Sequence, residues 1–166
     1  MIETLRLTLK PYSDQDQDKM IELLTHPIIK ETIIIPDFKT KEEAAIMFEK
    51  LKDYSFDPHH YERGIYLKGE LIGFVNDVEI NGKSIELGYV IHPDHHHQGY
   101  ATEVLQAVIQ DLFNAGYTEI ITGAFEKNRA SCRVMEKCGM QLFDRVEDME
   151  YQGVLQRCIY YHIQKK

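Results

Sequence analysis

Apolar and polar residues alternate in several short stretches of this 166-residue chain, which is the period of a half-buried β-strand. These stretches lie at residues 5–9, 61–68, 71–80, 83–92, 118–125, 140–149 and 155–163. The dipeptide Asn81-Gly82 separates two of them and is a strong signal for a tight hairpin turn. The middle of the chain is therefore predicted to form an antiparallel meander.

A second period, with apolar residues at i, i+3, i+4 and i+7, predicts amphipathic helices between the strands. The predicted helices cover residues 13–25, 40–53, 99–115 and 128–137. Thr40-Lys-Glu-Glu43 has the form of a capping box at one helix start. Residues 28–37 are apolar without a clear period and predict a short helix and a loop, and residues 54–63 read as a loop. The order βααβββαβαββ predicts an α+β fold with one mixed, mostly antiparallel sheet flanked by helices.

The stretch from Glu86 to Val104 combines a strand, a loop and a helix start. Pro93 ends the strand, and Gly99 stands immediately before a helix whose apolar face begins at Ala101. A small residue at this point lets backbone N–H groups approach a ligand, with the positive end of the helix dipole behind them. The pattern is compatible with a phosphate cradle, and equally with a tight loop that needs small residues.

Composition narrows the class of protein. An apolar content of 43% and a charged content of 28% are typical of a globular protein, and the length predicts one domain, residues 1–166. No apolar run approaches a membrane span, and no signal peptide pattern is present, so no membrane partner is expected. Three cysteines in no framework spacing favour a reducing cytoplasm. The net charge of −8 disfavours nucleic acid and favours a cationic amine or basic peptide as partner.

Three motifs in order give the chain a family resemblance. They are Glu3-Thr-Leu-Arg6-Leu-Thr-Leu-Lys-Pro11, His96-x-x-Gly99-x-Ala101, and Asn128-Arg-Ala-Ser131 followed by Lys137-Cys-Gly139. The sequence thereby resembles the GNAT superfamily of N-acyltransferases, and within it the ribosomal-protein N-terminal acetyltransferase branch. It departs from the family pattern at the phosphate loop, where His96 replaces the usual Gln or Arg and Gln98 stands where Lys or Arg is common.

The resemblance implies an enzyme that transfers an acetyl group from acetyl-CoA to a primary amine within a ternary complex. The acceptor would be a protein N-terminus or a small-molecule amine, and a homodimer is one possible assembly. Pantetheine would pair with the backbone of Tyr89, Val90 and Ile91, and with the amide of Asn128. The diphosphate would meet backbone N–H groups along the phosphate loop. That loop consists of His96, His97, Gln98, Gly99, Tyr100 and Ala101.

Two residues are candidates for proton transfer. Glu86 lies on the strand face opposite Leu87 and is either a general base, directly or through water, or a solvated strand residue. The resemblance assigns protonation of the leaving sulfur to Ser131, whose alternative role is a helix-start hydroxyl bonded to its own backbone. Cys132 could be reactive because it lies near a helix start.

Two alternatives remain at this point. The histidines at 92 and 95–97 suggest metal binding, but their spacing matches no defined zinc motif, so no metal is predicted. A non-catalytic acyl-CoA-binding or regulatory domain could share the same fold, because a fold does not determine a function. The sequences at 25–38 and 54–63, the expected substrate walls, do not identify the acceptor.

Overall fold

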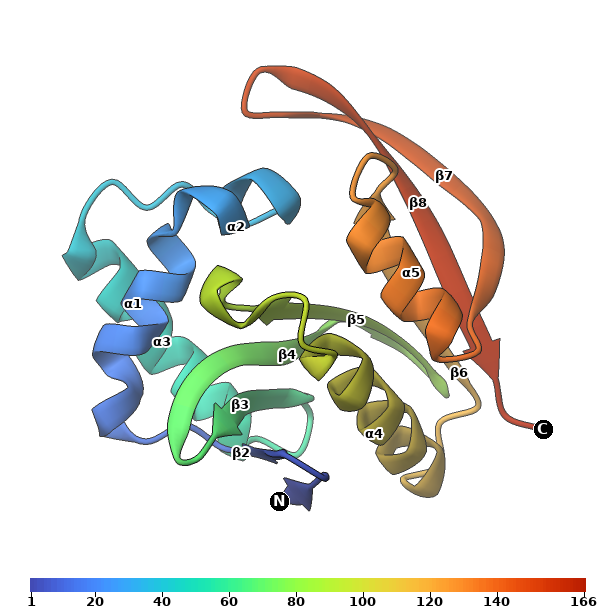
Figure 1. Cartoon of the computed structure of the whole chain (residues 1–166), viewed down its shortest axis with the longest axis horizontal. Helices are drawn as coiled ribbons and strands as arrows, with labels where there is room; N and C mark the ends of the chain where they lie inside the picture. Colours follow the sequence, from blue (N-terminus) through green and yellow to red (C-terminus); the bar gives the residue numbers. More distant parts are fainter. The chain divides into compact units, whose positions relative to one another are not determined.

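The computed structural model describes residues 1–166, which form two compact units. The N-terminal unit comprises Met1–Asp77 and Tyr89–Tyr100, and the C-terminal unit comprises Val78–Gly88 and Ala101–Lys166. Strands β4 (Glu70–Asn81) and β5 (Ser84–Ile91) therefore contribute to both units (Figure 1). The eight strands follow the order β1-β2-β3-β4-β5-β6-β8-β7 in the sheet.

The N-terminal unit pairs short strands with a group of helices. Strand β2 (Leu7–Lys10) lies antiparallel between β1 (Ile2–Glu3) and β3 (Glu62–Leu67), and β3 pairs with β4. Its helices are the 3₁₀ helix η1 (Asp14–Asp16), α1 (Gln17–Thr25), α2 (Pro27–Thr32) and α3 (Lys41–Phe56). Leu7 and Leu9 are buried at alternate positions of β2, as the strand period predicts, whereas Leu5, the first residue of the predicted stretch, is exposed and lies before the strand. A core cluster that includes Tyr12, Met20, Leu23, Phe48 and Phe74 joins the helices to the strands.

The start of α3 shows how the sequence determines a helix end. The Thr40 hydroxyl accepts a hydrogen bond from the Glu43 N–H at 3.1 Å, as a capping box requires. The Glu43 carboxylate, however, accepts from the N–H of Lys39 at 2.7 Å instead of that of Thr40. The cap is therefore shifted by one residue on its carboxylate side, and both bonds still satisfy backbone donors near the helix start.

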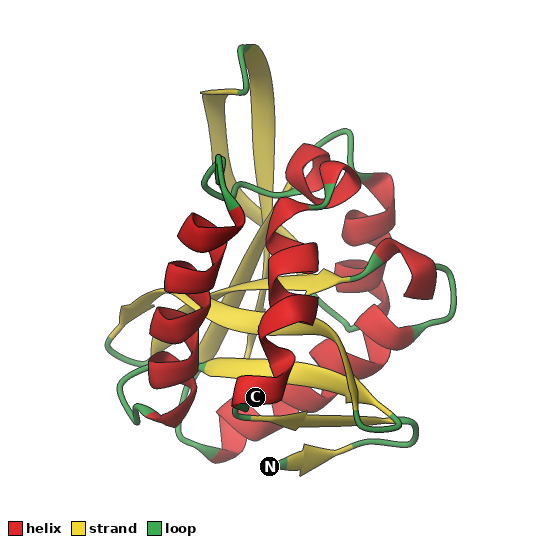
Figure 2. Ribbon diagram, turned by 90° about the vertical axis from the view of Figure 1, so that its left-hand side faces the viewer, coloured by secondary structure: helices red, strands yellow, loops and turns green.

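The C-terminal unit contains the later strands and two helices. Strand β6 (Glu119–Phe125) is parallel to β5, and β8 (Val154–Gln164) lies antiparallel between β6 and β7 (Gln141–Tyr151). Strands β7 and β8 form a long two-stranded ribbon (Figure 2). The helices are α4 (Tyr100–Asn114), whose buried residues repeat with the predicted period, and α5 (Arg129–Lys137). A smaller cluster of Phe125, Cys158 and Tyr160 packs with side chains of the ribbon.

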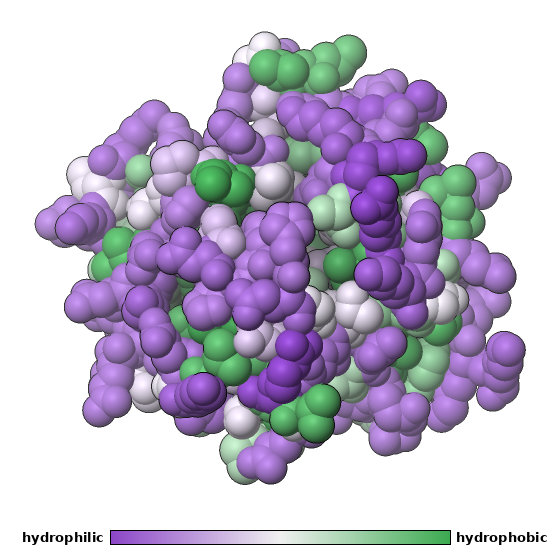
Figure 3. Space-filling model, in the orientation of Figure 1, coloured by the Kyte–Doolittle hydropathy of each residue, from purple (hydrophilic) through white to green (hydrophobic).

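The predicted fold class is confirmed, and the differences are local. The hairpin turn falls at Gly82 and Lys83, one residue later than predicted, and the φ of +60° at Gly82 explains the glycine there. Helix α3 extends to Phe56 and β3 begins at Glu62, so the predicted loop at 54–63 is shorter than expected. On the face shown in Figure 3, hydrophilic residues predominate and hydrophobic ones are scattered. None of the helices has the length and apolar character needed to cross a membrane.

Candidate active site

The phosphate loop follows β5 and leads directly into α4. His92 caps the 3₁₀ helix η2 (Pro93–His95), and α4 begins at Tyr100. Gly99 has a φ of +81°, which residues with a Cβ rarely adopt, and a Cβ there would lie 3.4 Å from Nη2 of Arg6. His97 also has a positive φ, of 61°. The backbone conformation thus favours glycine at this position, and the close ligand approach that the sequence suggested stays a prediction.

Arg6 contacts two residues of this loop, Gln98 and Tyr100, and sequence reasoning gave it no role at the site. Its Nη1 donates to the carbonyl oxygen of Gln98 at 2.8 Å, and its guanidinium carbon lies 4.4 Å from the centre of the Tyr100 ring. The peptide between Gln98 and Gly99 is trans, so its N–H points opposite to its C=O. Arg6 therefore holds the Gly99 N–H directed away from the guanidinium. No local pattern could have paired residues that lie 92 positions apart.

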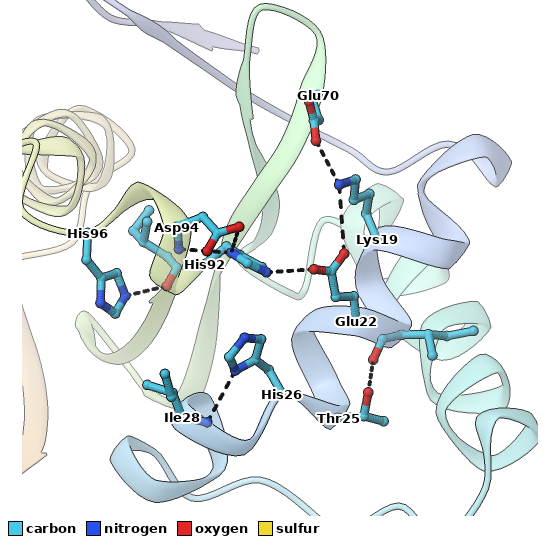
Figure 4. Close-up of polar contacts among 11 residues, drawn as sticks. Lys19, Glu22, Thr25, His26, Ile28, Glu70, His92, Asp94 and His96 are labelled. Atoms are coloured by element: carbon cyan, nitrogen blue, oxygen red, sulfur yellow. Dashed lines mark hydrogen bonds and ion pairs between the residues drawn. The ribbon is translucent and has the colours of Figure 1, made fainter.

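His92 is held between α1 and the loop (Figure 4). Its Nδ1 accepts from the N–H of Asp94 at 3.1 Å, so the proton of the neutral ring is on Nε2, which donates to Glu22 at 2.8 Å. Glu22 also lies 3.7 Å from the Lys19 ammonium, which pairs with Glu70 at 2.8 Å. The hydrogen bond from Lys19 lowers the pKa of Glu70. Both ring nitrogens of His92 are thus hydrogen-bonded, one to Asp94 and the other to Glu22 of α1, and His92 anchors the start of the loop.

The three consecutive histidines have separate surroundings. The Nε2–H of His96 donates to the carbonyl of Ile91 at 2.7 Å, because a carbonyl can only accept. This bond connects the loop to Ile91, the last residue of β5 (Figure 4). The His95 ring lies 6.3 Å from that of Tyr100, and the His97 ring stands at 90° to that of His96. The three rings do not converge on one point.

The strand segment assigned to pantetheine lies beyond the parallel ladder. The pairs between β5 and β6 run from Ser84 with Glu119 to Leu87 with Thr122, whereas β5 continues to Ile91. On the other side, a Cβ at Gly73 of β4 would lie only 2.1 Å from the carbonyl oxygen of Val90. Gly73 is therefore needed for the path of β5 next to the loop.

Glu86 is held in an ionic cluster of the C-terminal unit. Arg145 places Nη1 3.1 Å from Glu86 and Nη2 3.0 Å from Glu147, with its guanidinium carbon 4.0 Å from the centre of the Tyr160 ring. The Tyr160 hydroxyl donates to Glu147 at 2.8 Å, and this bond, followed by Arg145, lowers the pKa of Glu147. The Glu86 side chain is only 11% exposed, so the interpretation as a solvated strand residue is wrong.

Arg145 is a further residue that the sequence analysis missed. Strand β7 changes register between Phe143 and Val146, so Arg145 lies in an irregular stretch of the strand. Such irregularities redirect side chains and are frequent near active sites. The alternation of β7 alone does not reveal where the register changes, and the sequence therefore offers no signal for the pairing of Arg145 with Glu86.

Helix α5 begins at the predicted residue. The Asn128 side-chain oxygen accepts from the Ser131 N–H at 3.3 Å, so Asn128 is the N-cap, and the hydrogens of its amide nitrogen remain donors. The position of Cys132 near the helix start does not make it reactive, because the side chain is buried and burial raises the pKa of its thiol. Burial also raises the pKa of Cys138, to about 11.

Comparison with known proteins identifies the family. The model of the acetyltransferase (GNAT) domain family matches residues 6–141. The chain belongs to the GNAT acetyltransferase family. An uncharacterized N-acetyltransferase of Bacillus subtilis, YoaA, is 27% identical to this GNAT protein over 158 residues, covering 92% of the chain and 89% of the relative.

Solved structures confirm the GNAT fold. RimL, a ribosomal L7/L12 α-N-protein acetyltransferase in complex with coenzyme A, superposes with a TM-score of 0.86 at 17% identity, covering 97% of this chain and 95% of RimL. Spermidine N-acetyltransferase of Vibrio cholerae, in complex with CoA and spermine, superposes with a TM-score of 0.83 at 21% identity, covering 96% and 95%. The predicted resemblance is confirmed, and the protein is an acetyl-CoA-dependent acetyltransferase.

Proposed function

We propose that this protein transfers the acetyl group of acetyl-CoA to a primary amine, and that residues 1–166 act as one catalytic domain. The fold neighbours acetylate a protein N-terminus in one case and spermidine in another, and both acceptors present an amine. The three free cysteines are compatible with a reducing cytoplasm. Acetyl-CoA supplies the activated acyl group, and direct attack in a ternary complex requires no covalent enzyme intermediate.

The loop before α4 is the observation that carries the proposal. Gly99 leaves room for a ligand at the N-terminus of α4, where the first-turn N–H groups have no partner within the helix. Arg6 directs the Gly99 N–H away from itself, and a diphosphate accepts such donors. Backbone N–H groups from His97 to Ala101 would bind it, whereas the His96 N–H already donates to the carbonyl of Pro93 at 3.1 Å. The backbone of Tyr89, Val90 and Ile91, beyond the ladder with β6, would pair with pantetheine.

Two side chains of the C-terminal unit take the roles of base and acid. Glu86 accepts the proton that the amine loses, directly or through one water, and Ser131 donates a proton to the sulfur that leaves. Arg145 holds the Glu86 carboxylate in one orientation. The Asn128 amide, whose oxygen caps α5, would donate from its nitrogen to a pantetheine carbonyl.

The test is thiol release from acetyl-CoA with a panel of primary amines. Glu86→Gln should lower kcat/KM by roughly 10²–10⁴-fold, as expected for a lost general base, and should leave the Kd of CoA unchanged. Ser131→Ala should lower kcat while both substrates still bind. Glu147→Gln is the matched control, because it also removes a carboxylate bonded to Arg145. An equal loss of rate in Glu147→Gln would show that Glu86 acts only through the ionic cluster.

A further inference from the structure

A pocket of about 390 Å³ lies at the start of α5 in the C-terminal unit. Its lining is strongly charged, with Lys127, Arg129, Arg157, Glu126 and Gln156. Three cations thus face one carboxylate in a chain whose net charge is −8. Arg157 lies 3.6 Å from Glu126, so that carboxylate partly neutralises one of the three cations. The local excess of positive charge is opposite to the charge of the whole protein.

The cations also oppose the dipole of α5. Lys127 and Arg129 flank Asn128, the N-cap, and the first turn of the helix contains no acidic residue. A helix N-terminus carries partial positive charge, so cations are unfavourable there and anions are favourable. An anion in the pocket would interact with the side chains and the helix end together. Gln156, which is 8% exposed, adds an amide to the lining.

We propose that this pocket binds an anionic group, a carboxylate or a phosphate, of the acceptor, which is then an amine with an acidic substituent. The inference rests on the proposed function, which assigns pantetheine and the leaving sulfur to Asn128 and Ser131, next to Lys127 and Arg129 in the chain. The 3′-phosphate of CoA is attached beside the diphosphate, which the proposed function assigns to the loop before α4, and it therefore lies at the opposite end of CoA from the sulfur. The volume is sufficient for a substituent of amino-acid size.

One arm of the experiment tests the acceptor. Thiol release from acetyl-CoA is measured with matched pairs of amines, each pair consisting of an acid and its neutral counterpart: dipeptides and their amides, and ethanolamine phosphate and ethanolamine. The acidic member of a pair should have the higher kcat/KM. Arg129→Gln should then reduce this preference roughly 3- to 10-fold, as expected for one partly exposed charged hydrogen bond.

The other arm tests CoA. Calorimetry compares the Kd of CoA with that of dephospho-CoA, without any acceptor. Arg129→Gln should leave the difference between the two ligands unchanged, and a reduced difference would show that the pocket holds the 3′-phosphate and would overturn the assignment to the acceptor. The double variant Lys127→Gln/Arg157→Gln should reduce the preference for the acidic acceptor further than Arg129→Gln does.

Arg133→Gln provides the matched control, because Arg133 is exposed on the same helix and does not line the pocket. A response of Arg129→Gln in the acceptor arm, with Arg133→Gln unchanged, supports the proposal. Equal acceptor ratios for the two variants overturn it. Failure of the proposed function is a separate result: the wild-type enzyme would then release no thiol with any amine, before any pocket variant is compared.

Discussion

The buried carboxyl group of Glu62 should make the stability of this protein fall as the pH rises. Glu62 is 2% exposed at the start of β3, and the Tyr12 hydroxyl donates to it at 2.5 Å. Burial raises the pKa of Glu62 from 4.5 to about 8; the hydrogen bond from Tyr12 acts in the opposite direction, and the nearby Asp77 charge adds to the rise. At neutral pH the folded protein therefore keeps a proton on Glu62 that the unfolded chain has lost.

The magnitude follows from proton linkage. Between pH 4.5 and about 8 the folded state binds more protons at Glu62 than the unfolded state, so the free energy of unfolding falls with rising pH. Each pH unit contributes about 1.4 kcal/mol, and the window of about 3.5 units gives an upper value of about 5 kcal/mol. The contribution is fully present below pH 4.5 and is lost once the pH exceeds about 8.

Glu62→Gln tests this reasoning, because glutamine has the same shape and cannot titrate. Urea unfolding followed by circular dichroism from pH 5 to 8.5 gives the stability of both proteins, and their difference cancels the titration of the eight histidines. The variant should gain on the wild type by up to about 4 kcal/mol across this range. Tyr12→Phe removes the hydrogen bond that lowers the pKa of Glu62. In this variant the fall of stability with pH should therefore continue to a higher pH than in the wild type. A difference curve that is flat or falls with pH would refute a protonated Glu62.

Two further predictions concern the loop and the strand before it. Gly73→Ala should destabilise the protein by about 1–3 kcal/mol in urea unfolding and should weaken CoA binding. The reason is that the new Cβ would lie 2.1 Å from the carbonyl oxygen of Val90, so the backbone must move. An unchanged free energy of unfolding and an unchanged Kd of CoA would contradict this. Arg6→Lys should raise the Kd of CoA nearly as much as Arg6→Gln, because only a guanidinium both donates to Gln98 and stacks on Tyr100. Wild-type affinity in Arg6→Lys would show that the charge alone matters.

The regular elements were predictable because they bury one face with a fixed period. Alternation in β2 and the apolar repeat of α4 correspond to residues that are buried in the structure, and Asn128 caps α5 as its residue type suggests. Gly99 was also recognised, although its conformation adds a reason that the sequence could not give: a φ of +81° is a property of the folded loop. Periodicity thus identified the elements on either side of the loop.

The residues that were missed occupy irregular backbone. Arg6 lies in the bend between β1 and β2, and Arg145 lies where β7 changes register, so the predicted strands at 5–9 and 140–149 include both arginines without revealing where their side chains lie. Each arginine contacts a residue that is distant in the sequence: Arg6 contacts Gln98, and Arg145 contacts Glu86. Gln98 and Glu86 could be proposed as site residues because they lie in the phosphate loop and in the strand before it, whereas neither the motif around Arg6 nor the strand pattern around Arg145 gave the arginines a role.

The pairing of Glu86 with Arg145 affects how the proposed base would operate. The sequence presented Glu86 as a side chain that was either catalytic or solvated, and the structure shows it paired with Arg145 and mostly buried. A carboxylate whose oxygen accepts from a guanidinium offers its remaining lone pairs in directions that the pairing restricts. Proton transfer from the amine would therefore depend on Arg145 for its geometry. Mutation of Glu86 and of Arg145 should then show strongly non-additive losses of kcat/KM, because the two side chains act as one unit.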